Sequence, residues 1–137
     1  MSSGVLDGIR ILVVDDDRDT LEMLRFILEQ QGAEVTTVAR VVEAVDSLQK
    51  AAPDVILTDI GMPDFNGYAL IALVRANDKK TGQTTPAIAL TAYTSPADEE
   101  TALAAGFQRY MSKPFDPGDL IDAIRSLAKP SRRPHPR

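Results

Sequence analysis

Short apolar runs alternate with amphipathic segments of helical period along most of this chain. The segments expected to form strands lie at 9–14, which is mostly apolar, and at 33–38, 55–58, 87–91 and 109–112. The segments of helical period lie at 20–31, 41–51, 68–76, 97–105 and 119–128. Strands that alternate with helices form a parallel sheet covered by helices on both faces. The pattern therefore predicts a single doubly wound α/β domain.

The length of 137 residues fits one such domain. We expect 9–128 to form it, with 1–8 as an N-terminal extension and 129–137 as a basic, Pro-rich tail or the start of a linker. The absence of cysteine excludes a disulfide scaffold, a thiol nucleophile and a zinc–thiolate site. No apolar run approaches the roughly 20 residues of a membrane span, and no signal peptide opens the chain. These features predict a cytoplasmic protein that does not bind membranes.

The charge of the chain is uneven. Its 15 basic and 20 acidic residues give a net charge of −5. The tail Lys129–Arg137 is basic and has no acidic residue, so the folded body is more acidic than the whole. Because affinity for nucleic acids comes from cationic side chains that displace counterions, we expect no direct DNA binding. His135 stands between two prolines with no helix to present it, which argues against a phosphodonor histidine.

Polar residues gather where the predicted strands end. Asp15 and Asp16 follow the first strand, Asp59 and Thr91 end the third and fourth, and Lys113 follows the fifth. In an open parallel sheet, ligands bind outside these carboxyl ends. Crowded carboxylates repel one another unless a cation compensates them. Oxygen ligands without His or Cys favour Mg²⁺, with Mn²⁺ as a substitute.

These residue types suit phosphoryl transfer. A carboxylate can attack phosphorus and form an aspartyl phosphate. The reaction mainly requires alignment and positive charge around the phosphoryl oxygens. Mg²⁺ and Lys113 would supply that charge, while the Thr91 hydroxyl and the backbone N–H of Ala92 can donate hydrogen bonds. The set predicts a carboxylate that accepts a phosphoryl group.

Five separated motifs occur in an order that resembles the receiver domain of response regulators in two-component signalling (the CheY-like family). They are ILVVDDD at 11–17, ILTDIGMPDFNGY at 56–68, ALTAY at 89–93, AAGF at 104–107 and YMSKPF at 110–115. The resemblance covers about Gly8 to Ala128. It implies a flavodoxin-like sheet of strand order 2-1-3-4-5.

The resemblance also assigns roles. Asp59 would be the phosphoacceptor, and Lys113, in a cis peptide with Pro114, would pair with the phosphoryl group. Thr91 and Tyr110 would be the switch pair that changes the surface of the fourth helix, fifth strand and fifth helix. The implied magnesium ligands are Asp16, Asp59 and the backbone carbonyl of Gly61, with Asp15 acting mostly through water.

As a receiver, the chain would take its phosphoryl group from a histidine kinase or a histidine phosphotransfer domain. It would assist its own phosphorylation and dephosphorylation rather than turn over a substrate. It would be a monomer or a phosphorylation-dependent homodimer, and its output partner is not indicated. Both a stand-alone regulator and the C-terminal receiver of a hybrid histidine kinase fit the sequence.

Three other functions fit the sequence less well. A phosphatase of the haloacid-dehalogenase type needs D-x-D-x-T, but Asp19 stands where Thr or Val belongs. A receiver-like module that takes no phosphate is disfavoured by the complete site. A flavodoxin-like cofactor binder needs a phosphate loop that is missing after the first strand.

Several residues have local interpretations. We expect Asp17 and Asp19 to cap the first helix or form its turn, and Gly67 to permit a backbone turn near the metal. Tyr93 is bulky and Gly61 has no side chain, which leads to the hypothesis that Tyr93 shields the acyl phosphate and slows its hydrolysis. The segment 77–86 should lie at the far end of the sheet.

Overall fold

The computed structural model describes residues 4–60, 67–92 and 96–128. Its strands are β1 (Arg10–Val14), β2 (Glu34–Val38), β3 (Val55–Asp59), β4 (Ala87–Thr91) and β5 (Arg109–Ser112). Its helices are α1 (Arg18–Gln30), α2 (Val41–Lys50), α3 (Gly67–Thr81), α4 (Pro96–Ala105) and α5 (Pro117–Leu127). The predicted alternation is confirmed.

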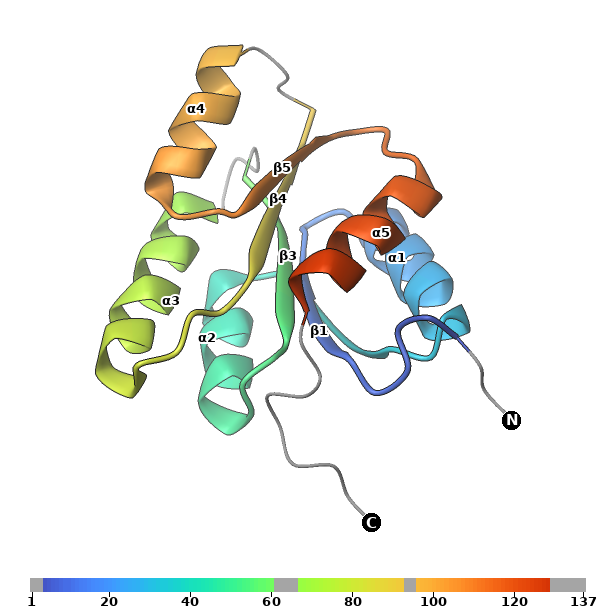
Figure 1. The fold of residues 1–137 in the computed structure, drawn as a ribbon, viewed down its shortest axis with the longest axis horizontal. Helices are drawn as coiled ribbons and strands as arrows, with labels where there is room; N and C mark the ends of the chain where they lie inside the picture. The colour runs from blue at the N-terminus through green and yellow to red at the C-terminus, as the bar shows by residue number, and fades with distance from the viewer. Residues whose placement is uncertain (1–3, 61–66, 93–95, 129–137) are drawn as a thin grey trace.

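The sheet has the order β2-β1-β3-β4-β5, and every neighbouring pair is parallel. Figure 1 shows α1 and α5 on one face of it and α2, α3 and α4 on the other. This is the flavodoxin-like arrangement expected from the sequence. No helix among the described residues is long and apolar enough to cross a bilayer.

Each face of the sheet has its own core. One buries apolar residues of α1 and α5, among them Leu24 and Leu120, against the sheet. The other buries residues of α2, α3 and α4, among them Leu70 and Ala102. Because helices cover both faces, four residues of β3 and all five of β4 are buried. The central strands are thus fixed rigidly, and so are the residues at their ends.

Helix α3 is longer than the sequence pattern predicted. The apolar period ends at Ala76, but the helix continues to Thr81. Asp78, expected in a loop, is 7% exposed and receives hydrogen bonds from Arg75 and Thr85. Polar contacts within the helix and to the loop that follows it, which apolar periodicity does not record, accompany this extension of more than a turn.

The segment predicted as an N-terminal extension contributes to the core. The Leu6 side chain is fully buried, and its backbone N–H donates to the Gln31 carbonyl at 2.9 Å. Gly8 donates in the same way to Gly32 at 3.2 Å. Residues 4–8 therefore pack against the end of α1, beyond the boundary expected at residue 9.

Candidate functional site: a lysine between two aspartates

The sequence-predicted site residues come from four strand ends at one edge of the sheet. Asp59 and Thr91 are the last residues of β3 and β4, Asp15 directly follows β1, and Lys113 directly follows β5. All these strands run parallel, so their carboxyl ends lie together. The topology thus brings together residues that are distant in sequence.

Lys113 lies between two of the carboxylates. Its Nζ donates to Asp15 Oδ2 at 2.7 Å and to Asp59 Oδ2 at 2.7 Å. The side chains of Lys113, Asp15 and Asp59 are 22%, 2% and 14% exposed, respectively. Crowded carboxylates need a compensating cation, and the residue types predicted that this cation is a metal ion. In this structure the lysine ammonium compensates them.

Backbone hydrogen bonds place the two ends of this cluster. The backbone N–H of Lys113 donates to the Thr91 carbonyl at 2.8 Å, and the Lys113–Pro114 peptide is cis, as the resemblance implied. On the other side, the backbone N–H of Asp15 donates to the Val38 carbonyl at 3.2 Å. Asp15 Oδ1 accepts the backbone N–H of Asp17 at 2.9 Å. Both oxygens of the Asp15 carboxylate are therefore hydrogen-bonded.

The environment changes the acidity of two of these groups. Burial raises the pKa of Asp15 above its ordinary value, although the hydrogen bond and charge of Lys113 and the Asp17 N–H act against it. Burial alone would lower the pKa of Lys113. The hydrogen bonds to Asp15 and Asp59 and the charges of both carboxylates outweigh burial, so the Lys113 pKa is raised. At neutral pH the lysine is a fixed positive charge.

The donor set agrees with the chemistry of a hard divalent cation. Asp15 and Asp59 each have a carboxylate oxygen 2.7 Å from Lys113 Nζ, and Asp16, the next residue after Asp15, is exposed. Mg²⁺ requires few carboxylates and retains several waters. Within the described ranges, no three acidic, His or Cys side chains are gathered closely enough to hold a metal. Gly61, the predicted carbonyl ligand, lies outside those ranges.

The two predicted switch residues occupy neighbouring strands. Thr91 is fully buried, while Ala92, the predicted amide donor, is exposed. Tyr110 on β5 packs against the core on the α3 and α4 side, and its hydroxyl is buried without a hydrogen-bond partner in the part of the chain that the structure describes. Burial raises the Tyr110 pKa, and the charge of Asp98 adds to the effect.

The local roles of Asp17 and Gly67 can be compared with the structure. Asp17 is the N-cap of α1, as predicted: it accepts the Asp19 N–H at 3.3 Å and the Thr20 hydroxyl at 2.6 Å. Gly67 begins α3, and a Cβ there would lie 2.8 Å from the Asp59 carbonyl oxygen. Close packing against Asp59 and Ile60 at the end of β3 therefore explains this glycine. Tyr93 and His135 lie outside the described residues.

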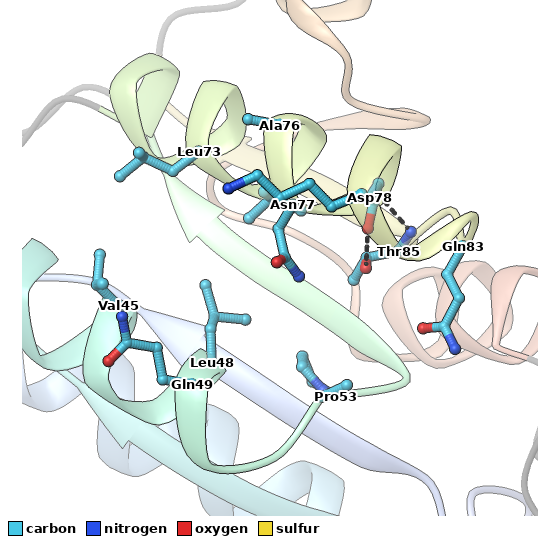
Figure 2. A pocket seen from close by; sticks show the side chains of 13 residues that line it. Val45, Leu48, Gln49, Pro53, Leu73, Ala76, Asn77, Asp78, Gln83 and Thr85 are labelled. Atoms are coloured by element: carbon cyan, nitrogen blue, oxygen red, sulfur yellow. Dashed lines mark hydrogen bonds between the residues drawn. The ribbon is translucent and has the colours of Figure 1, made fainter.

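A groove on another face was not anticipated. It lies between α2 and α3, has a volume of about 310 Å³ and is lined by residues that include Leu48, Pro53, Leu73 and Asn77 (Figure 2). None of the predicted site residues lines it. The sequence pattern did not predict the hydrogen-bond network centred on Arg75. Its only signal is the presence of polar residues within the apolar period of α3.

The chain belongs to the response regulator receiver domain family, whose model matches residues 11–125. An uncharacterized 14.6 kDa protein of the sodA1 3′ region in Leptolyngbya boryana is 46% identical over 84% of this chain and 86% of that protein. The structure of the chemotaxis response regulator CheY4 of Vibrio cholerae has a TM-score of 0.78 and 33% identity. That match covers 87% of this chain and 98% of CheY4.

Other relatives are much longer than this chain. Hybrid signal transduction histidine kinase D of Dictyostelium discoideum is 36% identical over 92% of this chain, which spans only 8% of the kinase. Several curated relatives, among them DNA-binding response regulators, are matched over half of their length or less. Similarity to such proteins concerns the receiver alone.

Proposed function

We propose that this chain is a phosphoacceptor receiver of a two-component phosphorelay, with Asp59 as the acceptor. One observation carries the proposal: the Lys113 ammonium lies 2.7 Å from an oxygen of Asp59 and 2.7 Å from an oxygen of Asp15. An aspartate at the mouth of a parallel sheet, beside a fixed cation and a second acid, is equipped to receive a phosphoryl group.

In the proposed step, a carboxylate oxygen of Asp59 attacks the phosphorus of a phosphohistidine. The O–P bond forms as the N–P bond breaks, and the imidazole leaves with the bonding electron pair. Lys113 then pairs with a phosphoryl oxygen, and the Thr91 hydroxyl and Ala92 N–H donate to others. Mg²⁺, held by Asp16, Asp59 and the Gly61 carbonyl with Asp15 through water, would add positive charge around the same oxygens.

The readout follows from the added charge. An aspartyl phosphate carries roughly −1.5 to −2 charge by analogy with other phosphoresidues. Thr91 moves toward it, and Tyr110 adjusts its position beside α4. A rearranged hydroxyl of Tyr110 could gain the hydrogen bond that its buried position lacks among the described residues. The surface of α4, β5 and α5 then signals to the output partner.

The proposed donor is a histidine kinase or a histidine phosphotransfer protein. A co-crystal structure from Saccharomyces cerevisiae contains such a phosphotransfer protein with the receiver domain of its downstream response regulator. That receiver has the same fold at 23% identity and a TM-score of 0.82. On this chain, the exposed Met23 and Phe26 of α1 offer an apolar contact surface for the donor. Similarity to a hybrid kinase is compatible with two forms of this protein: a receiver domain of a hybrid kinase and a stand-alone regulator.

The deciding experiment is intact-mass measurement after incubation with acetyl phosphate, with and without Mg²⁺. We expect a Mg²⁺-dependent gain of one phosphoryl group that is lost in Asp59→Asn. Asp19→Asn removes an exposed carboxylate close by, in the first turn of α1, and is the matched control that should retain the gain.

Other outcomes would refute the proposal in distinct ways. A protein that binds Mg²⁺ but gains no mass, from acetyl phosphate or from a phosphohistidine donor, would be a module without phosphoacceptance. Continuous release of inorganic phosphate from added substrates would instead favour the phosphatase. A gain retained in Asp59→Asn would place the acceptor elsewhere.

A further inference from the structure

The Arg75 side chain of α3 donates five hydrogen bonds. Its Nε and Nη2 donate to the Gly106 carbonyl at 3.0 and 2.6 Å, and its Nη1 donates to the Thr85 carbonyl at 2.7 Å. Nη2 also donates to Gln108 Oε1 at 2.9 Å. The planar guanidinium thus links α3 to the segment before β4 and to the turn after α4.

An acidic partner fixes the arginine in place. Nη1 of Arg75 lies 2.7 Å from Asp78 Oδ2, one turn along α3, and the two side chains are 22% and 9% exposed. Asp78 also accepts the Thr85 backbone N–H at 3.0 Å and the Thr85 hydroxyl at 2.8 Å, the bonds drawn as dashed lines in Figure 2. A buried charge pair with this many hydrogen bonds has a single favoured geometry.

The network fixes the end of α4. Helix α4 ends at Ala105, and Gly106 follows with φ of +122°. A Cβ at Gly106 would lie 3.1 Å from Nε of Arg75, so both its conformation and the arginine require a glycine there. Gln108 connects this turn to β4, because its Oε1 accepts the Ala87 N–H at 2.8 Å.

The rest of α4 is held weakly by comparison. Its buried residue is Ala102, a small side chain, whereas α3 buries five residues. Leu103 is exposed, and so are Glu99 and Glu100 in the first half of the helix. The first turn begins five residues after Thr91. The N-terminal end of α4 therefore follows the end of β4 after a short segment, and its C-terminal end is bound to α3 through Gly106 and Arg75 (Figure 1).

We propose that Arg75 is a positioning residue that makes the Gly106 turn the fixed pivot of the response in α4. This inference rests on the proposed function. The phosphorylation-driven change is then confined to the N-terminal half of α4, and residues 103–108 keep their place. The output surface is altered by a swing of α4 about its C-terminal end.

Hydrogen–deuterium exchange of the full chain, before and after phosphorylation by acetyl phosphate with Mg²⁺, tests this proposal. In the wild type we expect exchange over 96–102 to change several-fold and exchange over 103–108 to stay within two-fold. In Arg75→Lys, which retains the charge beside Asp78 but loses the forked geometry, the change should extend through 103–108. Lys79→Met, on an exposed position of the same helix, is the control and should behave as the wild type.

Intact mass, read on each sample, separates the two levels of the argument. No mass gain in the wild type would overturn the proposed function and this inference with it. A mass gain with 103–108 responding as strongly as 96–102 would overturn the inference alone. A confined response in Arg75→Lys would do the same, because a role of charge or general stability would then suffice. Even if a variant fails to fold, the wild-type comparison decides whether the response is confined to 96–102.

Discussion

Replacing Lys113 by Met removes the cation between Asp15 and Asp59 and leaves two neighbouring carboxylates uncompensated. Removing one partner of a fully buried pair costs about 3–5 kcal/mol of unfolding free energy. Here the lysine side chain is 22% exposed and Asp59 14%, so solvent compensates part of the lost charge. We expect a loss of about 2 kcal/mol at pH 8 in metal-free buffer.

Urea unfolding measures this loss. With a slope of about 1–3 kcal/mol/M, the midpoint should fall by roughly 1 M. The matched control is Lys50→Met, which breaks an exposed pair: Lys50 Nζ lies 3.1 Å from Asp46 Oδ2, with side chains 75% and 62% exposed. That control should lose less than about 0.5 kcal/mol.

The pH dependence gives a second, independent test. Because the pKa of Lys113 is raised, the contribution of this lysine to the free energy of unfolding is complete below the ordinary lysine pKa. It is lost only as the pH rises through the raised value. The raised Asp15 pKa means that protonation favours the folded state, a contribution lost as the pH rises through that value. Without Lys113 the Asp15 pKa rises further, so the penalty should be smaller at pH 5 than at pH 8. Equal losses in both variants, or a penalty independent of pH, would refute this reasoning.

Three further predictions concern the core, the switch and the metal. Leu6→Ala should cost about 2–5 kcal/mol of unfolding free energy, whereas Val5→Ala, at a residue 46% exposed, should change it by less than about 0.5 kcal/mol; equal effects in chemical unfolding would contradict the packing of this segment. Tyr110→Phe should leave the unphosphorylated protein as stable as before or up to about 1 kcal/mol more stable, because the lost hydroxyl is buried without a partner among the described residues; a clear decrease in Tm would show a hidden hydrogen bond. Mg²⁺ should raise Tm in the wild type and less in Asp16→Asn, and an equal rise would remove Asp16 from the metal site.

The sequence predicted the elements better than their ends. The apolar run of the buried strand β4 predicts its observed bounds, and the short strand β5 also has the bounds expected, although its residues are not buried. The same signal fails at Asp78, where hydrogen bonds to Arg75 and Thr85 extend α3, and at Leu6, whose partners are distant in sequence. Apolar periodicity records neither case, because the Asp78 contacts are polar and those of Leu6 depend on segments that meet only in the folded chain.

For the candidate site, strand-end positions in a parallel sheet were enough to predict which residues converge, because topology alone brings Asp15, Asp59 and Lys113 to one edge. The strand-end positions were not enough to predict that the Lys113 ammonium compensates the two carboxylates. Two carboxylates and one ammonium at 2.7 Å leave one negative charge in excess, even with the lysine fully protonated. Under the proposed function, a divalent cation would meet that excess at the site, and a phosphoryl group would increase it. Under the proposed function, a lysine and a metal would therefore be complementary here rather than alternatives: the lysine compensates part of the negative charge, and the remaining charge would attract the ion.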